Sequence, residues 1–189
     1  MIHNDLNKLI EGNKRFVNSS PINHNVGVSI NSSLTTQNPF AIILTCSDSR
    51  VGVNIIFDTK LGDLFIIKNA GNIVDMSTLA TIEFAVAKLN VSLIVVLSHQ
   101  SCGAVDYAIT TPKIDTEREK NFNFLLQQIR TIASEDKNQS AENISKKNAA
   151  FSKQKIIQDS MIIAEKIEKK ELNIVTAFYK ISTGKVTFY

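Results

Sequence analysis

Two cysteines and one histidine stand at positions that allow a metal site. The chain has two cysteines in all, Cys46 and Cys102, and His99 lies three residues before the second. Cysteine sulfur and imidazole nitrogen are ligands that suit Zn²⁺. Three protein ligands instead of four are typical of catalytic zinc sites, where the fourth position is open to water or substrate. The residue types therefore predict one catalytic Zn²⁺ per chain, held by Cys46, His99 and Cys102, that activates a water molecule.

A carboxylate and a guanidinium follow the first cysteine closely, in Cys46-Ser-Asp-Ser-Arg50. Alternate residues of an extended segment share one face, so Cys46, Asp48 and Arg50 are predicted to point into the same pocket. Arg50 can hold Asp48 in a bidentate geometry, and Asp48 can then orient a zinc-bound hydroxide by accepting its hydrogen bond. We therefore expect Asp48 and Arg50 to be catalytic. If Arg50 releases Asp48, the carboxylate can instead bind the zinc as a fourth ligand and close the site.

Three continuous apolar runs predict strands that are buried on both faces. They are residues 40–45, 64–68 and 93–98. Helical periodicity over residues 77–89 places a helix between the second and third runs. The fold class is therefore α/β, with a mostly parallel β-sheet flanked by helices. Because Cys46 and His99 directly follow the first and third runs, we expect them to meet at the carboxyl edge of the sheet, and Cys102 to begin the next helix.

The N-terminal segment is predicted to form an extended helical arm. Asn4 is expected to cap a first helix over residues 5–17. Residues 18–38 are polar and long for a bare loop, so we expect them to wrap the molecule or to contact a partner subunit.

The C-terminal half is predicted to hold two helices and two strands. The helices are expected over residues 117–133 and 152–170, separated by a polar surface connection over residues 136–148. The strands are expected over residues 173–179 and 185–189, joined by a turn at residues 182–185.

The length of the chain favours a single domain over residues 1–189. Its parts are the N-terminal helix and arm (1–38), the zinc-site core (39–112) and the helices and C-terminal strands (113–189).

Bulk composition excludes several classes of protein. Apolar residues make up 43% of the chain and charged residues 21%, which argues against a wholly disordered chain. The net charge of +3, from 21 basic and 18 acidic residues, is too small to indicate a nucleic-acid partner. No signal-peptide pattern opens the sequence, and no segment reaches the roughly 18 apolar residues of a membrane span. We therefore expect a cytoplasmic protein with no nucleic-acid or membrane partner.

At its candidate site the sequence resembles the β-class carbonic anhydrases. That family carries C-x-D-x-R and, later, H-x-x-C, which stand here as Cys46-Ser-Asp-Ser-Arg50 and His99-Gln-Ser-Cys102. The similarity is dense over residues 40–108 and thin over residues 115–170. Other matching segments are residues 9–16, 39–51, 62–65, 70–72, 102–105 and 174–188.

The resemblance implies a zinc enzyme that interconverts carbon dioxide and bicarbonate, with the ligands and the Asp48–Arg50 dyad already named. It also implies that Gly103 and Ala70 contact the substrate. Members of the family form dimers or larger assemblies, so a homodimer or a dimer-based tetramer is expected, with the first helix embracing a neighbouring subunit.

Several positions depart from the family pattern. Ser98 stands where glycine is frequent before the histidine, and Lys68 where arginine is usual. Gly52-Val53 replaces a common proline-containing pair, and Thr59-Lys60 occupies the place of a pocket glutamine. Members that are regulated by a second bicarbonate site carry a tryptophan where this chain has Ile43, and the chain has no tryptophan. Such regulation is therefore not expected, and the metal ligands are unaffected by these changes.

Three alternatives remain open from the sequence. The same zinc site could serve a hydrolase of a related small molecule such as carbonyl sulfide. A non-catalytic zinc-stabilised module would need a fourth protein ligand. A thiol redox protein ranks lowest, because the two cysteines do not form a C-x-x-C motif.

Overall fold

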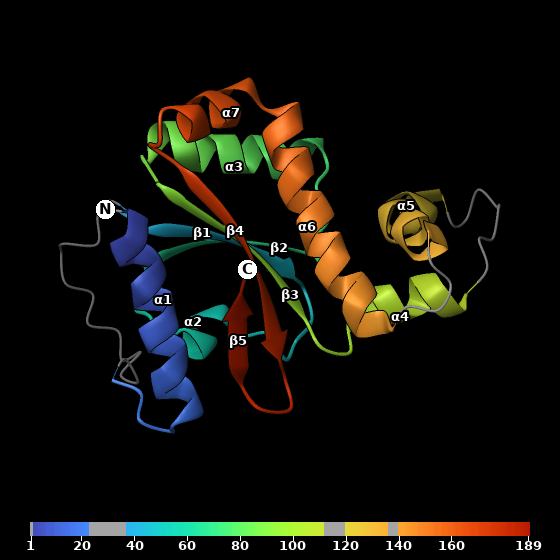
Figure 1. The fold of residues 1–189 in the computed structure, drawn as a ribbon, viewed down its shortest axis with the longest axis horizontal. Helices are drawn as coiled ribbons and strands as arrows, with labels where there is room; N and C mark the ends of the chain where they lie inside the picture. Colours follow the sequence, from blue (N-terminus) through green and yellow to red (C-terminus); the bar gives the residue numbers. More distant parts are fainter. Residues whose placement is uncertain (1, 23–36, 112–119, 136–139) are drawn as a thin grey trace.

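The computed structural model describes residues 2–22, 37–111, 120–135 and 140–189, and its centre is a five-stranded sheet (Figure 1). The strands are β1 (Ala41–Cys46), β2 (Leu64–Asn69), β3 (Leu93–His99), β4 (Asn173–Lys180) and β5 (Lys185–Phe188). Their order is β2-β1-β3-β4-β5, and every neighbouring pair is parallel except β4 and β5. The chain passes from β1 to β2 on one side and then to β3 on the other side of β1. The strand order therefore switches between β1 and β3, and the predicted mostly parallel sheet is confirmed.

Both faces of the central strands are buried, which explains their continuous apolar runs. All residues of β1 and β3 are buried. In β1, Ile42 and Leu44 belong to the hydrophobic cluster on one face, whereas Ala41 and Ile43 belong to the cluster on the other. An amphipathic alternation is absent from these strands because each face needs apolar side chains.

Helices cover the two faces and one end of the sheet (Figure 1). Their bounds are α1 (Ile2–Val17), α2 (Val53–Ile56), α3 (Met76–Lys88), α4 (Gly103–Thr110), α5 (Lys120–Glu135), α6 (Ala141–Asp159) and α7 (Met161–Glu168), with a 3₁₀ turn η2 (Ala70–Asn72). Helices α3, α6 and α7 contribute to one cluster, and α1 and α2 to the other. A third cluster joins α4, α5, α6 and Ile73, the residue after η2, around Cys46 and Cys102. The predicted helix over residues 77–89 corresponds to α3.

Helix α1 starts earlier than predicted and packs on its own chain. Asn4 lies inside α1 and does not cap it. The buried Asn13 donates to the carbonyls of Ile56 (3.1 Å) and Gly184 (2.9 Å) and accepts from the amide of Val186 (2.8 Å). An embrace of a neighbouring subunit by this helix stays a prediction, and residues 23–36 of the expected arm lie outside the described residues.

The segment between α5 and β4 corrects two predictions. Residues 141–148 form the first part of α6, although residues 136–148 were predicted as a surface connection. The single helix expected over residues 152–170 is interrupted at Ser160, which caps α7 by accepting from the amide of Ile163 (3.3 Å). Helix α5 matches the predicted helix, whose residues 117–119 lie outside the described part of the chain.

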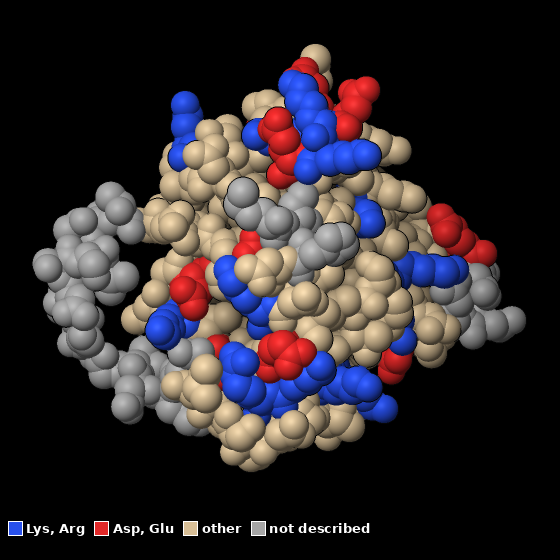
Figure 2. All heavy atoms as spheres, turned by 60° about the vertical axis from the view of Figure 1, so that its left-hand side comes forward, with Lys and Arg blue, Asp and Glu red and all other residues tan. Residues whose placement is uncertain are grey.

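Charged side chains of both signs lie beside one another on the face shown in Figure 2. On the helices several of them pair one turn apart, as Lys155 does with Asp159 and Lys146 with Glu142. Among the described residues, none of the helices combines the length and apolar character needed to cross a bilayer.

Candidate metal centre

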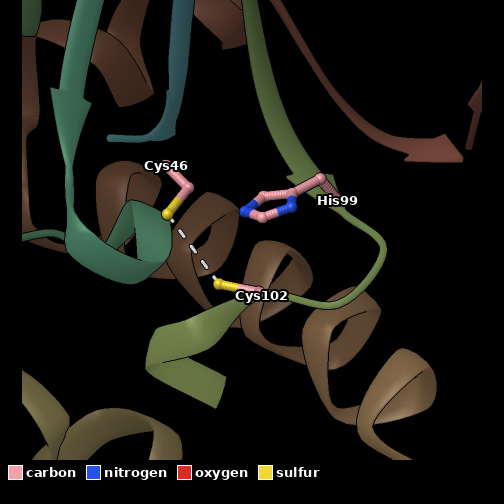
Figure 3. A group of neighbouring side chains, drawn as sticks. All are labelled: Cys46, His99 and Cys102. Atoms are coloured by element: carbon pink, nitrogen blue, oxygen red, sulfur yellow. Dashed lines mark hydrogen bonds between the residues drawn. The ribbon is translucent and has the colours of Figure 1, made fainter. Parts of the chain in front are cut away.

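The carboxyl ends of β1 and β3 bring together the three predicted metal ligands. Cys46 is the last residue of β1, His99 is the last residue of β3, and Cys102 follows three residues later (Figure 3). One ligand atom from each residue lies within 4.8 Å of the other two, and all three residues are buried. The site therefore forms where the strand order switches, as is general for open α/β sheets.

The two sulfur atoms have the spacing of two ligands of one metal ion. Cys46 Sγ and Cys102 Sγ are 3.8 Å apart. Two sulfurs that each lie about 2.3 Å from a tetrahedral Zn²⁺ are separated by about 3.8 Å. Cys102 is also the N-cap residue of α4, and the amides of Ala104 and Val105 in the first turn favour the charged form of its sulfur. The donor set and its spacing therefore fit Zn²⁺.

The imidazole of His99 presents one nitrogen to the sulfurs. Its Nδ1 lies 2.9 Å from the carbonyl oxygen of Gln100, and because a carbonyl only accepts, Nδ1 carries the proton. Nε2 is buried and has no hydrogen-bond partner among the described residues. Figure 3 shows the ring directed toward Cys46 and Cys102. A buried lone pair without a donor is costly unless a cation binds it, which supports the assignment of Nε2 as a metal ligand.

The two thiols influence each other strongly. The Cys102 thiol donates a hydrogen bond to Cys46 Sγ, and this interaction lowers the pKa of Cys46 well below its ordinary value. The same contact, together with burial, raises the pKa of Cys102. A Cys102 thiolate would be repelled by the neighbouring Cys46 thiolate. The amide of Gly71 also donates to Cys46 Sγ, at 3.4 Å. A divalent cation between the sulfurs would offset the repulsion between the two negative charges, so that both cysteines could be thiolates.

Asp48 and Arg50 form the predicted bidentate pair. Arg50 Nε donates to Asp48 Oδ1 at 2.9 Å, and Nη2 donates to Oδ2 at 2.7 Å. This guanidinium lowers the pKa of Asp48 well below its ordinary range, so the carboxylate stays charged. The segment is a turn and not an extended strand, since the amides of Arg50 and Val51 bond back to Asp48. In the described part of the chain, the candidate ligand group contains three residues and Asp48 is not one of them.

Comparison with known proteins identifies the family. The profile of the family described as carbonic anhydrase matches residues 41–186. A carbonic anhydrase of Helicobacter pylori is 31% identical over 176 residues, which cover 82% of this chain and 78% of that protein. The chain belongs to the β-class carbonic anhydrase family.

Other members of the carbonic anhydrase family agree with this assignment. Carbonic anhydrase 2 of Mycobacterium tuberculosis is 49% identical over 102 residues, which are 53% of this chain and 49% of that protein. The match therefore spans about half the length of that relative. A tetrameric β-carbonic anhydrase from Sordaria macrospora has a similar fold, with a TM-score of 0.76, 24% identity, and coverage of 98% of this chain and 96% of that one.

The positions that depart from the carbonic anhydrase pattern have identifiable contacts. Lys68 Nζ donates to the carbonyl oxygen of Val51 at 3.0 Å and lies 3.5 Å from that of Asp48, so it supports the turn that carries the dyad. Ser98 is fully buried and donates to the carbonyl of Ala177 at 3.2 Å. Lys60 uses its backbone amide to bond Asp63 at 2.8 Å. None of these contacts removes a metal ligand.

The two residues expected to contact the substrate lie beside the ligands. Ala70 begins η2, next to Gly71, and Gly103 begins α4, next to Cys102. A Cβ on Gly103 would meet no described atom within 4 Å, so open space lies above this residue. Their role in substrate binding remains a prediction.

Four residues near the candidate ligands were not identified from the sequence. The amide of Gly71 contacts a ligand sulfur directly. Ser145, Asn148 and Ser152 of α6 bond to backbone carbonyls beside the ligands. A polar spacing of three and four residues in this segment was the available signal, but a solvated helix face has the same spacing.

Proposed function

We propose that this chain catalyses the reversible hydration of carbon dioxide, in which carbon dioxide and water give bicarbonate and a proton. The observation that carries the proposal is the three-ligand cluster of Cys46, His99 and Cys102 beside the Asp48–Arg50 pair. Three ligands are the pattern of a catalytic zinc site and four that of a structural one. A non-catalytic module is less well supported, because both oxygens of Asp48 are engaged by Arg50.

The chain's own residues orient the reacting water. A bound Zn²⁺ would supply Lewis acidity that lowers the pKa of a water ligand. Each carboxylate oxygen has two acceptor sites, so Asp48 can accept from Arg50 and still accept a hydrogen bond from the water. Because Asp48 remains ionised beside Arg50, it accepts this hydrogen bond and does not compete as a donor. The water then presents a lone pair to the carbon of carbon dioxide.

The charge of the ligand set indicates the pH dependence. Zn²⁺ with two thiolates and one neutral imidazole carries no net formal charge, whereas a site of three histidines keeps both positive charges. The water here should therefore be less acidic than the value of about 7 found with three histidines. The Gly71 amide that donates to Cys46 Sγ offsets part of this difference. We expect activity to rise toward alkaline pH.

The proposal extends to assembly, domain organisation and location. The Sordaria macrospora relative is described as tetrameric, and several large apolar side chains are exposed here, among them Met76, Phe84 and Phe124. Both observations support a homodimer or a dimer-based tetramer.

One continuous sheet supports a single domain over residues 1–189. Both cysteines are free thiols, which supports a reducing compartment such as the cytoplasm.

Stopped-flow measurement of carbon dioxide hydration from acid to alkaline pH, on the zinc-loaded protein, tests the proposal. We expect a kcat that increases with pH and a protein that contains about one zinc per chain. Absence of hydration at every pH would contradict the proposed function. Carbonyl sulfide assayed in parallel distinguishes the rival hydrolase, which would turn over that substrate and leave carbon dioxide unchanged.

A further inference from the structure

A stripe of buried polar side chains runs along α6. Ser145, Asn148 and Ser152 are three and four residues apart, so they lie on one face of the helix. Their exposed fractions are 3%, 0% and 0%. Polar groups buried to this extent need partners inside the protein, so the stripe must serve groups on the elements against which α6 packs.

The partners of the stripe are carbonyls of the two segments that carry or flank the metal ligands. Ser145 Oγ donates to the carbonyl of His99 at 3.2 Å. Asn148 Nδ2 donates to the carbonyl of Gly71 at 2.7 Å, and Ser152 Oγ donates to the carbonyl of Asn72 at 2.9 Å. Asn148 and Ser152 therefore hold two consecutive carbonyls of η2.

Helix α5 fixes the orientation of the Asn148 amide. Gln128 Nε2 donates to Asn148 Oδ1 at 2.7 Å and to Ser152 Oγ at 3.0 Å. Because the Oδ1 atom of Asn148 receives this hydrogen bond, its Nδ2 group is the one that faces Gly71. The network thus has one consistent direction, from Gln128 through Asn148 to the η2 backbone.

Gly71 connects this network to the metal centre. Its carbonyl accepts from Asn148, and its amide donates to Cys46 Sγ at 3.4 Å. These two groups belong to the peptides on either side of one Cα, whose φ of 77° is a conformation that glycine adopts without strain. A Cβ here would also meet Ile129 Cδ1 at 2.8 Å. The backbone at this point is therefore confined on the side of α5 and α6.

We propose that Asn148 is a positioning residue of the metal site: it fixes the backbone of Gly71 so that the Gly71 amide donates to the Cys46 ligand and strengthens metal binding. The inference rests on the metal-binding part of the proposed function. The hydrogen bond from the Gly71 amide orients the Cys46 sulfur, so the ligand is held in its binding position before the metal arrives. Partners that support metal ligands from outside the coordination sphere typically contribute about 10–100-fold in metal affinity.

The test compares Asn148→Ala with a matched control, Asn13→Ala. Both asparagines are buried and donate to backbone carbonyls, but the partners of Asn13 lie at Ile56, Gly184 and Val186, away from the ligands. Zinc dissociation constants are measured by competition with a chelator at fixed pH. We expect Asn148→Ala to raise the constant about 10-fold or more and Asn13→Ala to leave it unchanged, while both lower the thermal stability.

Cobalt substitution gives a readout that a purely structural role would not move. Without the Gly71 hydrogen bond the lone pairs of the Cys46 sulfur are less stabilised, so its charge-transfer band to Co²⁺ should move to lower energy in Asn148→Ala and stay in place in Asn13→Ala. Should Asn148→Ala fail to fold, Ser152→Ala removes the adjacent bond to Asn72 with a smaller change, and we expect it to weaken zinc binding in the same direction.

The outcomes separate this inference from the proposed function. An unchanged zinc constant and cobalt band in the folded Asn148→Ala protein would overturn the role of Asn148 and leave carbon dioxide hydration intact. If only Ser152→Ala folds, an unchanged constant there has the same meaning. A parent protein that binds no zinc would overturn both proposals together.

Discussion

Arg50 joins the two turns that carry the metal ligands. Its guanidinium holds Asp48 through two hydrogen bonds, and Nη2 also donates to the carbonyl of Ser101 at 2.8 Å. Ser101 directly precedes Cys102, so one side chain spans from the segment after Cys46 to the ligand turn after β3. The planar guanidinium can make these hydrogen bonds at the same time because its donors are fixed relative to one another. A lysine ammonium has no such fixed set of donors. The position of Asp48 relative to the ligands therefore depends on Arg50.

Replacing Arg50 by alanine should lower activity with little effect on stability. Asp48 loses its bidentate partner and becomes free to move toward the metal, so kcat/KM for carbon dioxide hydration should fall about 10²-fold, as expected for a misplaced orienting group. The Arg50 side chain is 49% exposed, and solvent screens its ion pair with Asp48, so the urea midpoint should change little. Stopped-flow kinetics and urea unfolding measure the two quantities.

The conservative variant Arg50→Lys serves as the control for charge. It keeps the positive charge but not the two parallel donors, and we expect it to recover only a small part of the lost activity. Full activity in either variant would contradict the role of the dyad.

At the scale of the element, α3 depends on the cap at its first turn. Asp75 Oδ1 accepts a hydrogen bond from the amide of Thr78 at 2.7 Å, which satisfies one of the free amides at the helix start. This amide favours the charged carboxylate and lowers the pKa of Asp75 below its ordinary value of 3.8. Because α3 packs on β2, where Phe84 contacts Phe65, and contributes Ile82 to the core cluster of that face, the cap contributes to the covering of one sheet face.

Asp75→Ala should destabilise the protein by about 1 kcal/mol at neutral pH. Because the pKa of Asp75 is lower in the folded state, its contribution is present above the ordinary value of 3.8 and is lost as the pH falls through the lowered value. Urea unfolding of both proteins should therefore give a difference at pH 7 that shrinks below pH 3.8.

Asp75→Asn keeps a side-chain acceptor without the charge. We expect this control to lose less stability than the alanine variant at neutral pH, since asparagine is also a favourable N-cap. A difference between parent and Asp75→Ala that stays constant through acid pH would show that the charge of Asp75 is not involved.

For the molecule as a whole, the metal centre ties together elements from distant parts of the sequence. Its three ligands come from the end of β1, the end of β3 and the start of α4. A metal that binds the folded chain alone stabilises it by mass action, by about 2.7 kcal/mol when the free metal is at 100 times its dissociation constant. Removal of zinc should therefore lower the Tm by about 5–11 °C for a domain of this size.

Differential scanning calorimetry with and without a chelator measures this shift. Cys102→Ser, which replaces one ligand by a residue of similar size, is the control, and its Tm should respond little to the chelator. Equal Tm values for the zinc-loaded and chelator-treated parent would contradict a metal that links these elements.

The sheet and the ligand set were predictable for a physical reason. Strands buried on both faces read as continuous apolar runs, and a polar residue that ends such a run marks the carboxyl edge of the sheet. Cys46 and His99 mark the ends of β1 and β3 in this way. The Asp48–Arg50 pair was also predicted, although the assumed extended segment is a turn.

The second layer of the site could not be predicted in the same way. Gly71 contributes a backbone amide. Every residue except proline has such an amide, so the residue type does not indicate this role. Ser145, Asn148 and Ser152 are polar, so the first part of α6 resembled a surface connection; they are buried because carbonyls of η2 and β3 accept their hydrogen bonds. Burial of polar residues depends on partners that are distant in sequence, which local patterns do not contain.

The docking of α1 through Asn13 also constrains how the chain can be made. Two of its partners, Gly184 and Val186, lie 171 and 173 residues away in sequence. On the ribosome, α1 leaves the exit tunnel long before these residues are added, while β1, β2 and β3 can already begin to assemble. The helix that is translated early therefore reaches its final position only after the last hairpin has emerged.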